Sequence, residues 1–294
     1  IRLQEALEQD MLCPFHYFGV SDIVVDGRVT DDDTAFDVLT SDERVKHILD
    51  KAEYFSHAGD RVKGLIFCSR KEEARVLSEM INARGLRTLA LVGDNTQDER
   101  EAAVSRLEQD EGDDCLDYIL TVDIFNEGVD IPAVNQILML RPTESATVFV
   151  QQLGRGLRKA EGKEYVVIVD FIGNYSKNFL IPIAFSGDRS HNKDNARKQL
   201  IVGGSTVPGS SSINFDPVAK ERIYESINRT NLSKLRMLKE EYGNTKARLG
   251  KEPDLTGLYG SGSLDPRVVV AHSGSLYGFR TRLKAEDRMM PVKE

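Results

Sequence analysis

Short apolar runs alternate with longer amphipathic stretches through the middle of the chain. The apolar runs occupy residues 64–68, 88–92, 118–121, 136–140 and 165–171. Stretches with helical spacing of apolar residues separate them, at 71–84, 97–107 and 145–157. Continuous apolar strands separated by helices are typical of a parallel sheet that is covered on both faces. Residues 61–185 are therefore predicted to form one α/β, doubly wound domain.

The segment before this domain, residues 1–60, is predicted to be a connector with a leading helix. Its pattern indicates a short helix at 3–9, an aromatic strand at 13–20 and a helix that begins after Ser41, a favourable N-cap residue. Because residues 1–40 have too few apolar strands to close a core, we expect them to pack on material that precedes the chain. The chain begins at Ile1 and not at Met, so we expect it to be a fragment of a longer protein.

The segment after this domain, residues 186–294, is predicted to be a smaller, mainly helical accessory domain. The pattern indicates a polar helix to 200, a Gly/Ser loop at 203–212, a helix at 217–227, a basic helical stretch at 231–251, a Gly/Ser tract at 257–263 and a strand at 267–271. The charged end of the chain, from residue 279, is expected to be loosely held.

Composition sets limits on the function. Hydrophobic residues make up 40% of the 294 positions and charged residues 29%, which suffices for a globular core, and no apolar run is long enough to span a bilayer. Cys13, Cys68 and Cys115 are far apart, which indicates neither a disulfide framework nor a zinc site. With no signal peptide at the start, a reducing, cytoplasmic compartment is expected. The net charge of −8 argues against a dedicated basic nucleic-acid module, although a local patch can still be basic.

Two polar segments marked by glycine, residues 121–132 and 151–158, flank apolar strands of the predicted sheet. In the second segment Gln151, Arg155 and Arg158 are spaced by four and three residues, which on a helix would place all three side chains on one face. Two guanidinium groups beside an amide suit the oxygens of a phosphate. The same residues would also suit a surface helix with two solvated arginines.

Three segments, in this order, resemble motifs of one family. Residues 64–70 resemble motif IV of superfamily 2 helicases, residues 121–132 resemble motif V, and residues 151–158 match the motif VI pattern QxxGRxxR. Residues 63–171 together resemble the C-terminal RecA-like lobe of a DEAD/DEAH-type helicase or translocase. The resemblance implies a RecA-like doubly wound parallel sheet.

The resemblance also implies roles in ATP hydrolysis. Arg158, and with it Arg155, would be the arginine finger that reaches the γ-phosphate, where a well-placed Arg can supply about 10³–10⁵ in rate. The positions it assigns to ATP binding are Gln151, Gly128, Asp130 and Gly154. Without the resemblance, Asp130 before Ile131 would simply be read as capping a turn.

The remaining roles concern nucleic acid. Thr121, Ser69 and Arg70, at the ends of predicted strands, would contact nucleic-acid phosphates. Thr121 could equally be an ordinary strand-end hydroxyl. The basic stretch at 231–251 could contact duplex phosphates, although a solvated helix face more often explains such a run. Nucleic acid, with duplex DNA favoured, is the expected partner; no membrane contact is expected.

Half of an ATPase site is missing from the sequence. No G-x-x-x-x-G-K loop followed by Ser or Thr is present, since Gly162-Lys163 and Gly250-Lys251 are each followed by Glu, and no D-E-x-H or D-E-x-D box follows an apolar strand. ATP and Mg²⁺ are therefore expected to be held mainly by an N-terminal RecA-like lobe outside this chain. No metal site is expected here, and the chain alone is expected to be inactive.

Two looser resemblances suggest the wider architecture. Residues 213–258, and residues 13–19 at the join between lobes, resemble a bacterial group with an N-terminal phospholipase-D-like domain and an uncharacterised C-terminal domain. Restriction or DNA repair would be the setting that this implies. The alternative is a non-enzymatic nucleic-acid-binding or scaffold module with a degenerate motor lobe, which the complete QxxGRxxR pattern disfavours.

Overall fold

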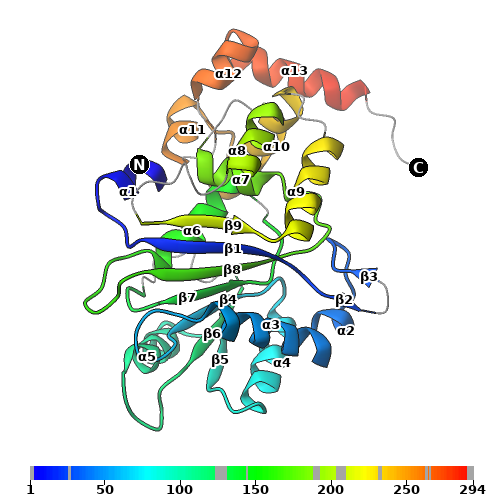
Figure 1. Cartoon of the computed structure of the whole chain (residues 1–294). Coiled ribbons are helices and arrows are strands. Elements are labelled where there is room, and N and C mark those ends of the chain that lie inside the picture. The colour runs from blue at the N-terminus through cyan, green and yellow to red at the C-terminus, as the bar shows by residue number, and fades with distance from the viewer. Residues whose placement is uncertain are drawn as a thin grey trace. The chain divides into compact units, whose positions relative to one another are not determined.

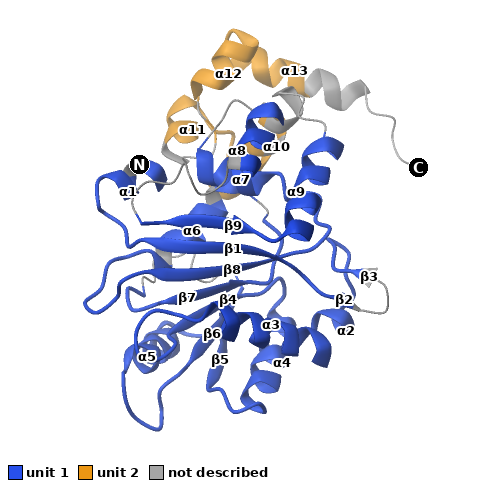
Figure 2. Cartoon of the chain, in the orientation of Figure 1, with its two compact units in different colours: residues 1–230 blue, residues 231–294 orange. Residues whose placement is uncertain are grey.

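The computed structural model describes residues 3–25, 28–122, 131–143, 145–187, 193–202, 210–230, 234–261, 264 and 266–289. The chain forms two compact units, residues 1–230 and residues 231–294 (Figure 2).

Unit 1 is built on a parallel sheet of seven strands in the order β5-β6-β4-β7-β8-β1-β9 (Figure 1). The strands are β1 (Phe15–Ser21), β4 (Gly64–Phe67), β5 (Thr88–Leu91), β6 (Tyr118–Thr121), β7 (Gln136–Met139), β8 (Val166–Ile172) and β9 (Ser212–Phe215). A separate antiparallel pair joins β2 (Val24–Val25) and β3 (Arg28–Val29). The α/β, doubly wound parallel sheet expected from the sequence is confirmed.

Helices connect these strands and cover the sheet. They are α1 (Leu3–Glu8), α2 (Phe36–Leu39), α3 (Asp42–Phe55), α4 (Lys71–Asn82), α5 (Gln97–Glu108), α6 (Ala146–Gly156), α7 (Leu180–Ser186), α8 (Lys193–Val202) and α9 (Pro217–Arg229). The chain reverses its direction across the sheet at β5, so right-handed connections place α3 and α4 on one face and α5 and α6 on the other. Strands β4, β6, β7 and β8 are buried along their whole length, as their continuous apolar sequences predict.

The expectation that residues 1–40 pack on material before the chain is wrong for β1. This strand lies inside the sheet, where Phe15 pairs with Val166 of β8 and His16 pairs with Ser212 of β9. Phe15 has no exposed surface. Its partner β9 comes from far along the sequence, so the pairing could not be read from local pattern. As a result, unit 1 ends at residue 230, whereas the predicted boundaries fell after 60 and 185.

Unit 2 consists of α10 (Lys234–Leu249), α11 (Leu255–Ser261), α12 (Pro266–Ser273) and α13 (Leu276–Met289) within its described residues. Its own hydrophobic core is formed by Leu238, Tyr242, Leu258, Leu264, Val269, Phe279 and Leu283. A mainly helical unit is therefore observed, although it begins later than predicted. None of the helices that the structure describes in either unit is both long and apolar enough to cross a bilayer.

Three expectations within unit 2 are wrong. The predicted strand at 267–271 is part of helix α12, which begins at Pro266, a residue suited to the first turn of a helix. Its valines are β-branched, but Val269 is buried while Val270 is 37% exposed, so packing on one side favours a helix over the local strand preference. Part of the predicted 257–263 loop belongs to α11. The start of the segment that was expected to be loosely held is packed into the core, since Phe279 is fully buried and Leu283 is 9% exposed.

Candidate functional site

The carboxyl ends of β4, β6 and β7 lie at one edge of the sheet. Phe67 of β4 is in register with Thr121 on one side and with Met139 on the other. The backbone N–H of Cys68 donates to the Thr121 carbonyl at 2.9 Å, which continues this pairing past the strand end. The structure thus brings the segments after β4 and β6 together, and this is the edge where doubly wound sheets bind ligands.

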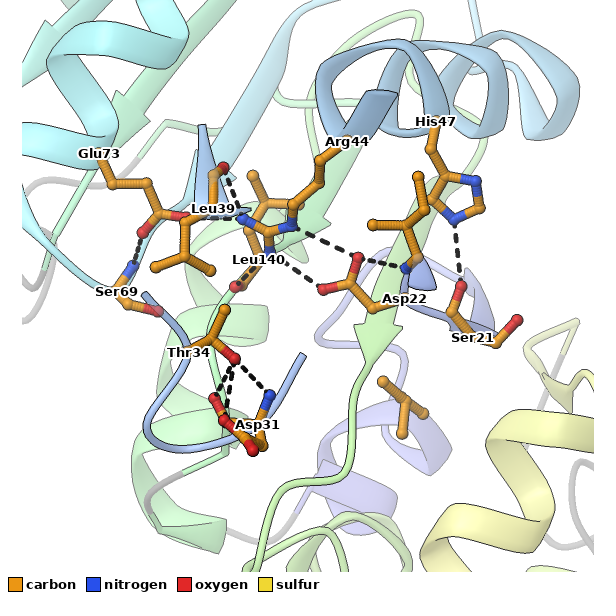
Figure 3. Close-up of polar contacts among 12 residues, drawn as sticks. Ser21, Asp22, Asp31, Thr34, Leu39, Arg44, His47, Ser69, Glu73 and Leu140 are labelled. Carbon is orange, nitrogen blue, oxygen red and sulfur yellow. Dashed lines mark hydrogen bonds and ion pairs between the residues drawn. The ribbon is translucent and has the colours of Figure 1, made fainter. Parts of the chain in front are cut away.

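A buried ion-pair network supports this edge (Figure 3). The Arg44 guanidinium on α3 pairs with Asp22 at 3.1 Å and with Glu73 at 2.9 Å, and all three side chains have no exposed surface. It also donates to the carbonyls of Leu39 at 3.0 Å and Leu140 at 3.3 Å. Burial alone would lower the pKa of Arg44, but the two carboxylates raise it above its ordinary value. The guanidinium is therefore a permanent charge whose hydrogen bonds are satisfied within the network.

The network also positions the Ser69–Arg70 corner. The second carboxylate oxygen of Glu73 accepts from the backbone N–H of Ser69 at 2.8 Å and of Arg70 at 3.3 Å. The Arg70 side chain is exposed and donates to the Thr34 carbonyl at 3.0 Å. The buried Glu73 carboxylate therefore fixes the main chain at residues 69–70, while the Arg70 guanidinium lies at the surface.

Thr121 lies where the sequence predicts, at the strand end, but its side chain has no exposed surface. Its Oγ1 has no hydrogen-bond partner within the described part of the chain, and neither does the buried Nε2 of Gln152. A side chain without exposed surface cannot reach a phosphate, so the predicted contact from Thr121 is not available in this structure. Two other predicted positions, Gly128 and Asp130, lie outside the described residues.

Helix α6 carries most of the QxxGRxxR segment. Gln151 is exposed on the helix, and Gly154 has open space where a Cβ would lie. The helix ends at Gly156, so Arg158 lies beyond its end, and its side chain is exposed. The prediction that Gln151, Arg155 and Arg158 share one helix face is therefore wrong for Arg158. The Arg155 side chain lies outside what the structure describes.

Lys163 explains why the chain leaves the helix at this point. Its ammonium donates to the carbonyls of Gly156 at 2.6 Å, Arg158 at 2.8 Å and Pro132 at 2.7 Å. The Leu157 carbonyl accepts from the backbone N–H of Cys13 at 2.7 Å. The carbonyls after α6 are thus satisfied by groups outside the helix, and a lysine near a helix C-terminus also suits the helix dipole. Burial lowers the pKa of Lys163 to about 8.

Sequence reasoning missed Lys163 and the Arg44 network. In the sequence Gly162-Lys163 resembles only a fragment of a phosphate loop, but a lysine shortly after a helix end is also a signal for capping. Arg44 at a position facing the core of an amphipathic helix was the available signal for a buried ion pair, because a buried arginine requires partners.

Gly156 allows close packing of α6 on the sheet. A Cβ at this position would lie 2.6 Å from Cδ1 of Ile137 in β7 and 3.3 Å from Cγ1 of Val134. The glycine therefore lets the helix end lie directly on the strand.

The two exposed arginines of the predicted site lie at opposite ends of the strands. Arg70 follows the carboxyl end of β4, whereas Arg158 follows α6 near the amino end of β7, because Lys163 holds both the Arg158 and the Pro132 carbonyls. Within the described ranges, no group of three or more His, Cys, Asp or Glu side chains could hold a metal ion. The buried thiol of Cys68 has its pKa raised well above the ordinary value by burial, so it is no nucleophile.

Part of the chain matches a known family of domains. Residues 43–160 match the family described as the helicase conserved C-terminal domain. IRC3 of Saccharomyces cerevisiae, whose name calls it an ATP-dependent helicase, is 31% identical over 158 residues, which cover 54% of this chain and 21% of IRC3. The ATP-dependent RNA helicase SrmB of Haemophilus influenzae is 27% identical over 116 residues, which cover 40% of this chain and 26% of SrmB.

The matched part spans about a fifth to a quarter of the length of these two relatives. Among solved structures, the ATP-dependent Type ISP restriction-modification enzyme LlaBIII bound to DNA aligns with 88% of this chain and 21% of its own, at 15% identity and a TM-score of 0.47.

Proposed function

We propose that unit 1 supplies the second motor lobe of an ATP-dependent helicase or translocase that acts on nucleic acid, with duplex DNA as the favoured substrate. The observation that carries the proposal is the QxxGRxxR segment at the end of α6, inside a region that matches a helicase C-terminal domain. In this proposal, an N-terminal RecA-like lobe of the same longer polypeptide holds most of ATP and Mg²⁺. The setting proposed is restriction or DNA repair.

Arg158, with Arg155, is proposed as the arginine finger. Phosphoryl transfer places negative charge on the oxygens of the transferred group, and a guanidinium stabilises that charge. Arg158 fits this role because it is exposed on the main-chain turn that Lys163 fixes. Gln151 and Gly154 on α6, with Gly128 and Asp130, are proposed to contact the nucleotide.

Ser69 and Arg70 are proposed to contact the nucleic-acid backbone. The exposed Arg70 side chain offers charge, and the half-buried Ser69 offers a hydroxyl at the same strand end. Thr121 is left out of this role as a side-chain contact because it is buried.

The test is ATP turnover by the longer protein with duplex DNA, for the wild type and Arg158→Ala. We expect turnover to fall about a hundredfold or more while nucleotide binding is kept, because the finger acts on the transition state. Arg229→Ala is the matched control, since this arginine is 75% exposed and pairs with Glu225 on the surface of α9. Equal turnover in all three proteins, or none in the wild type, would favour the scaffold alternative.

A further inference from the structure

Unit 2 differs in charge from the rest of the chain. Residues 231–294 contain 12 Lys and Arg against 8 Asp and Glu, a formal charge of +4. Residues 1–230 contain 27 against 39, a formal charge of −12. Unit 2 is therefore basic although the whole chain carries a negative net charge. A basic surface attracts a polyanion whatever the total charge of the protein.

Two helices of unit 2 follow each other across a very short turn (Figure 1). Only Gly274 and Ser275 separate α12 from α13. Gly274 has a φ of +76°, in the left-handed region that favours glycine. Its N–H donates to the Val270 carbonyl at 2.7 Å, and the Ser275 hydroxyl accepts from the N–H of Gly278 at 2.9 Å, which caps α13. A helix-turn-helix also joins two helices by a short turn that often contains glycine, although its turn is usually about three to four residues long and the turn here has only Gly274 and Ser275.

Packing fixes which side of α13 faces outward. Phe279 and Leu283 are buried in the core of unit 2 together with Val269 of α12. On the other side, Tyr277 is 80% exposed and Thr281 is exposed as well. These two residues are four positions apart, and the Thr281 hydroxyl donates to the Tyr277 carbonyl at 3.0 Å, so they share one face.

We propose that α13 is a recognition helix that docks in the major groove of duplex DNA, with Tyr277 and Thr281 facing the groove. In helix-turn-helix proteins the second helix enters the groove and its N-terminal residues contact bases, and Tyr277 lies in the first turn of α13. An α-helix about 10–12 Å across fits a groove about 12 Å wide. Tyr and Thr hydroxyls are ordinary donors to phosphates and base edges.

The same geometry predicts that α13 binds a DNA duplex and not an RNA duplex. The major groove of an A-form RNA helix is deep and narrow, so a helix cannot enter it. Docking of α13 therefore requires B-form DNA, and this choice comes from the shape of the ligand and not from charge, which both duplexes share.

The experiment measures the affinity of the full 294-residue chain for a fluorescent DNA duplex by anisotropy, without ATP. Two variants change the outward face of α13, namely Tyr277→Ala and Thr281→Glu. Their matched controls are Tyr259→Ala and Thr256→Glu on α11, where Tyr259 is 79% exposed and Thr256 is exposed. We expect each α13 variant to weaken binding about tenfold and each control to bind like the wild type. Circular dichroism checks that all four variants stay folded.

Several outcomes would overturn the proposal. They are no binding of duplex DNA by the wild type, equal affinity for an RNA duplex of the same length, equal loss in the α11 controls, or no loss in the α13 variants. Because the assay uses this chain without ATP, it is independent of the Arg158 test. Loss of binding in the α13 variants would stand even if the longer protein proved to have no ATPase activity.

Discussion

At the scale of single residues, Lys163 does more for the site than its sequence context suggests. Its ammonium group donates to three main-chain carbonyls, those of Gly156, Arg158 and Pro132. A buried carbonyl that loses its partner costs about 1–3 kcal/mol. The course of the chain at Arg158 therefore depends on a side chain that takes no direct part in the proposed chemistry, and Lys163 is a positioning residue.

Replacing Lys163 by Met tests this role. We expect Lys163→Met to lower the free energy of unfolding by about 1–3 kcal/mol, because the carbonyls of Gly156 and Pro132 lose a part-buried donor, whereas the Arg158 carbonyl is exposed to water. In the longer protein, we expect kcat for ATP to fall more than nucleotide affinity, because the turn that carries Arg158 is no longer fixed. Urea denaturation of this chain and steady-state kinetics of the longer protein are the measurements.

Lys159→Met is the matched control for this substitution. The Lys159 ammonium pairs with Asp10 at 2.6 Å, and the two side chains are 47% and 85% exposed. An exposed pair of this kind contributes about 0–1 kcal/mol, so the control should unfold like the wild type. Equal effects of the two substitutions on stability and on kcat would contradict the positioning role.

The residue spacing of the site could be predicted, but its geometry could not. The QxxGRxxR pattern is visible in the sequence, and α6 was predicted within one or two residues of its observed ends. The place of Arg158 was not predictable, because the end of α6 depends on Lys163 and on the N–H of Cys13, which is remote in sequence. Local spacing cannot show which distant group satisfies a carbonyl.

At the scale of elements, the Arg44 network joins parts of the chain that the sequence presents as separate. Arg44 on α3 contacts Asp22 after β1, Glu73 on α4 and the Leu140 carbonyl after β7. Through Glu73 the same network holds the backbone of Ser69. The end of β1 and the corner after β4 are therefore coupled through one guanidinium.

Arg44→Met is expected to destabilise unit 1 by about 3–5 kcal/mol, because it leaves two buried carboxylates without their partner. Lys46→Met, on the same helix, should have little effect, since Lys46 is 75% exposed and its partner Asp50 is 57% exposed. Urea denaturation of both variants measures the difference. Hydrogen exchange of the Ser69 amide should also be faster in Arg44→Met, and unchanged exchange there would contradict the coupling.

Helices and strands could be predicted where burial requires an apolar sequence. Strands β4, β6, β7 and β8 are buried throughout, so their apolar runs stand out. Strand β9 includes Ser212 and Asn214 and was not recognised, because its pairing with β1 and not its hydrophobicity defines it. In α12, tertiary packing overrode the strand preference of valine.

At the scale of the whole molecule, the contacts of residues 210–230 place them with the sheet of unit 1. The Asp216 carboxylate accepts from the N–H of Ser21 at 2.6 Å and from the N–H of Ala219 at 2.6 Å, so it links β1 to the start of α9. The Ser226 hydroxyl donates to the Ser176 carbonyl at 2.9 Å. These bonds span the boundary that the sequence predicted after residue 185, and they favour a boundary at 230.

Two truncated chains test whether the domain boundary lies after residue 230 or after residue 185. We expect residues 1–230 to unfold cooperatively at a temperature close to that of unit 1 in the full chain, because the sheet and α9 are complete. Residues 1–185 lack β9 and α9. Without β9 one edge of β1 is unpaired, and without α9 the buried side chains of Ile223 and Ile227 no longer contribute to the core. We therefore expect this shorter chain to melt at least about 10 °C lower or to aggregate, since a loss of several kcal/mol shifts the midpoint by that much. Thermal unfolding followed by circular dichroism, with size-exclusion chromatography, distinguishes the cases, and equal stability of the two fragments would restore the boundary at 185.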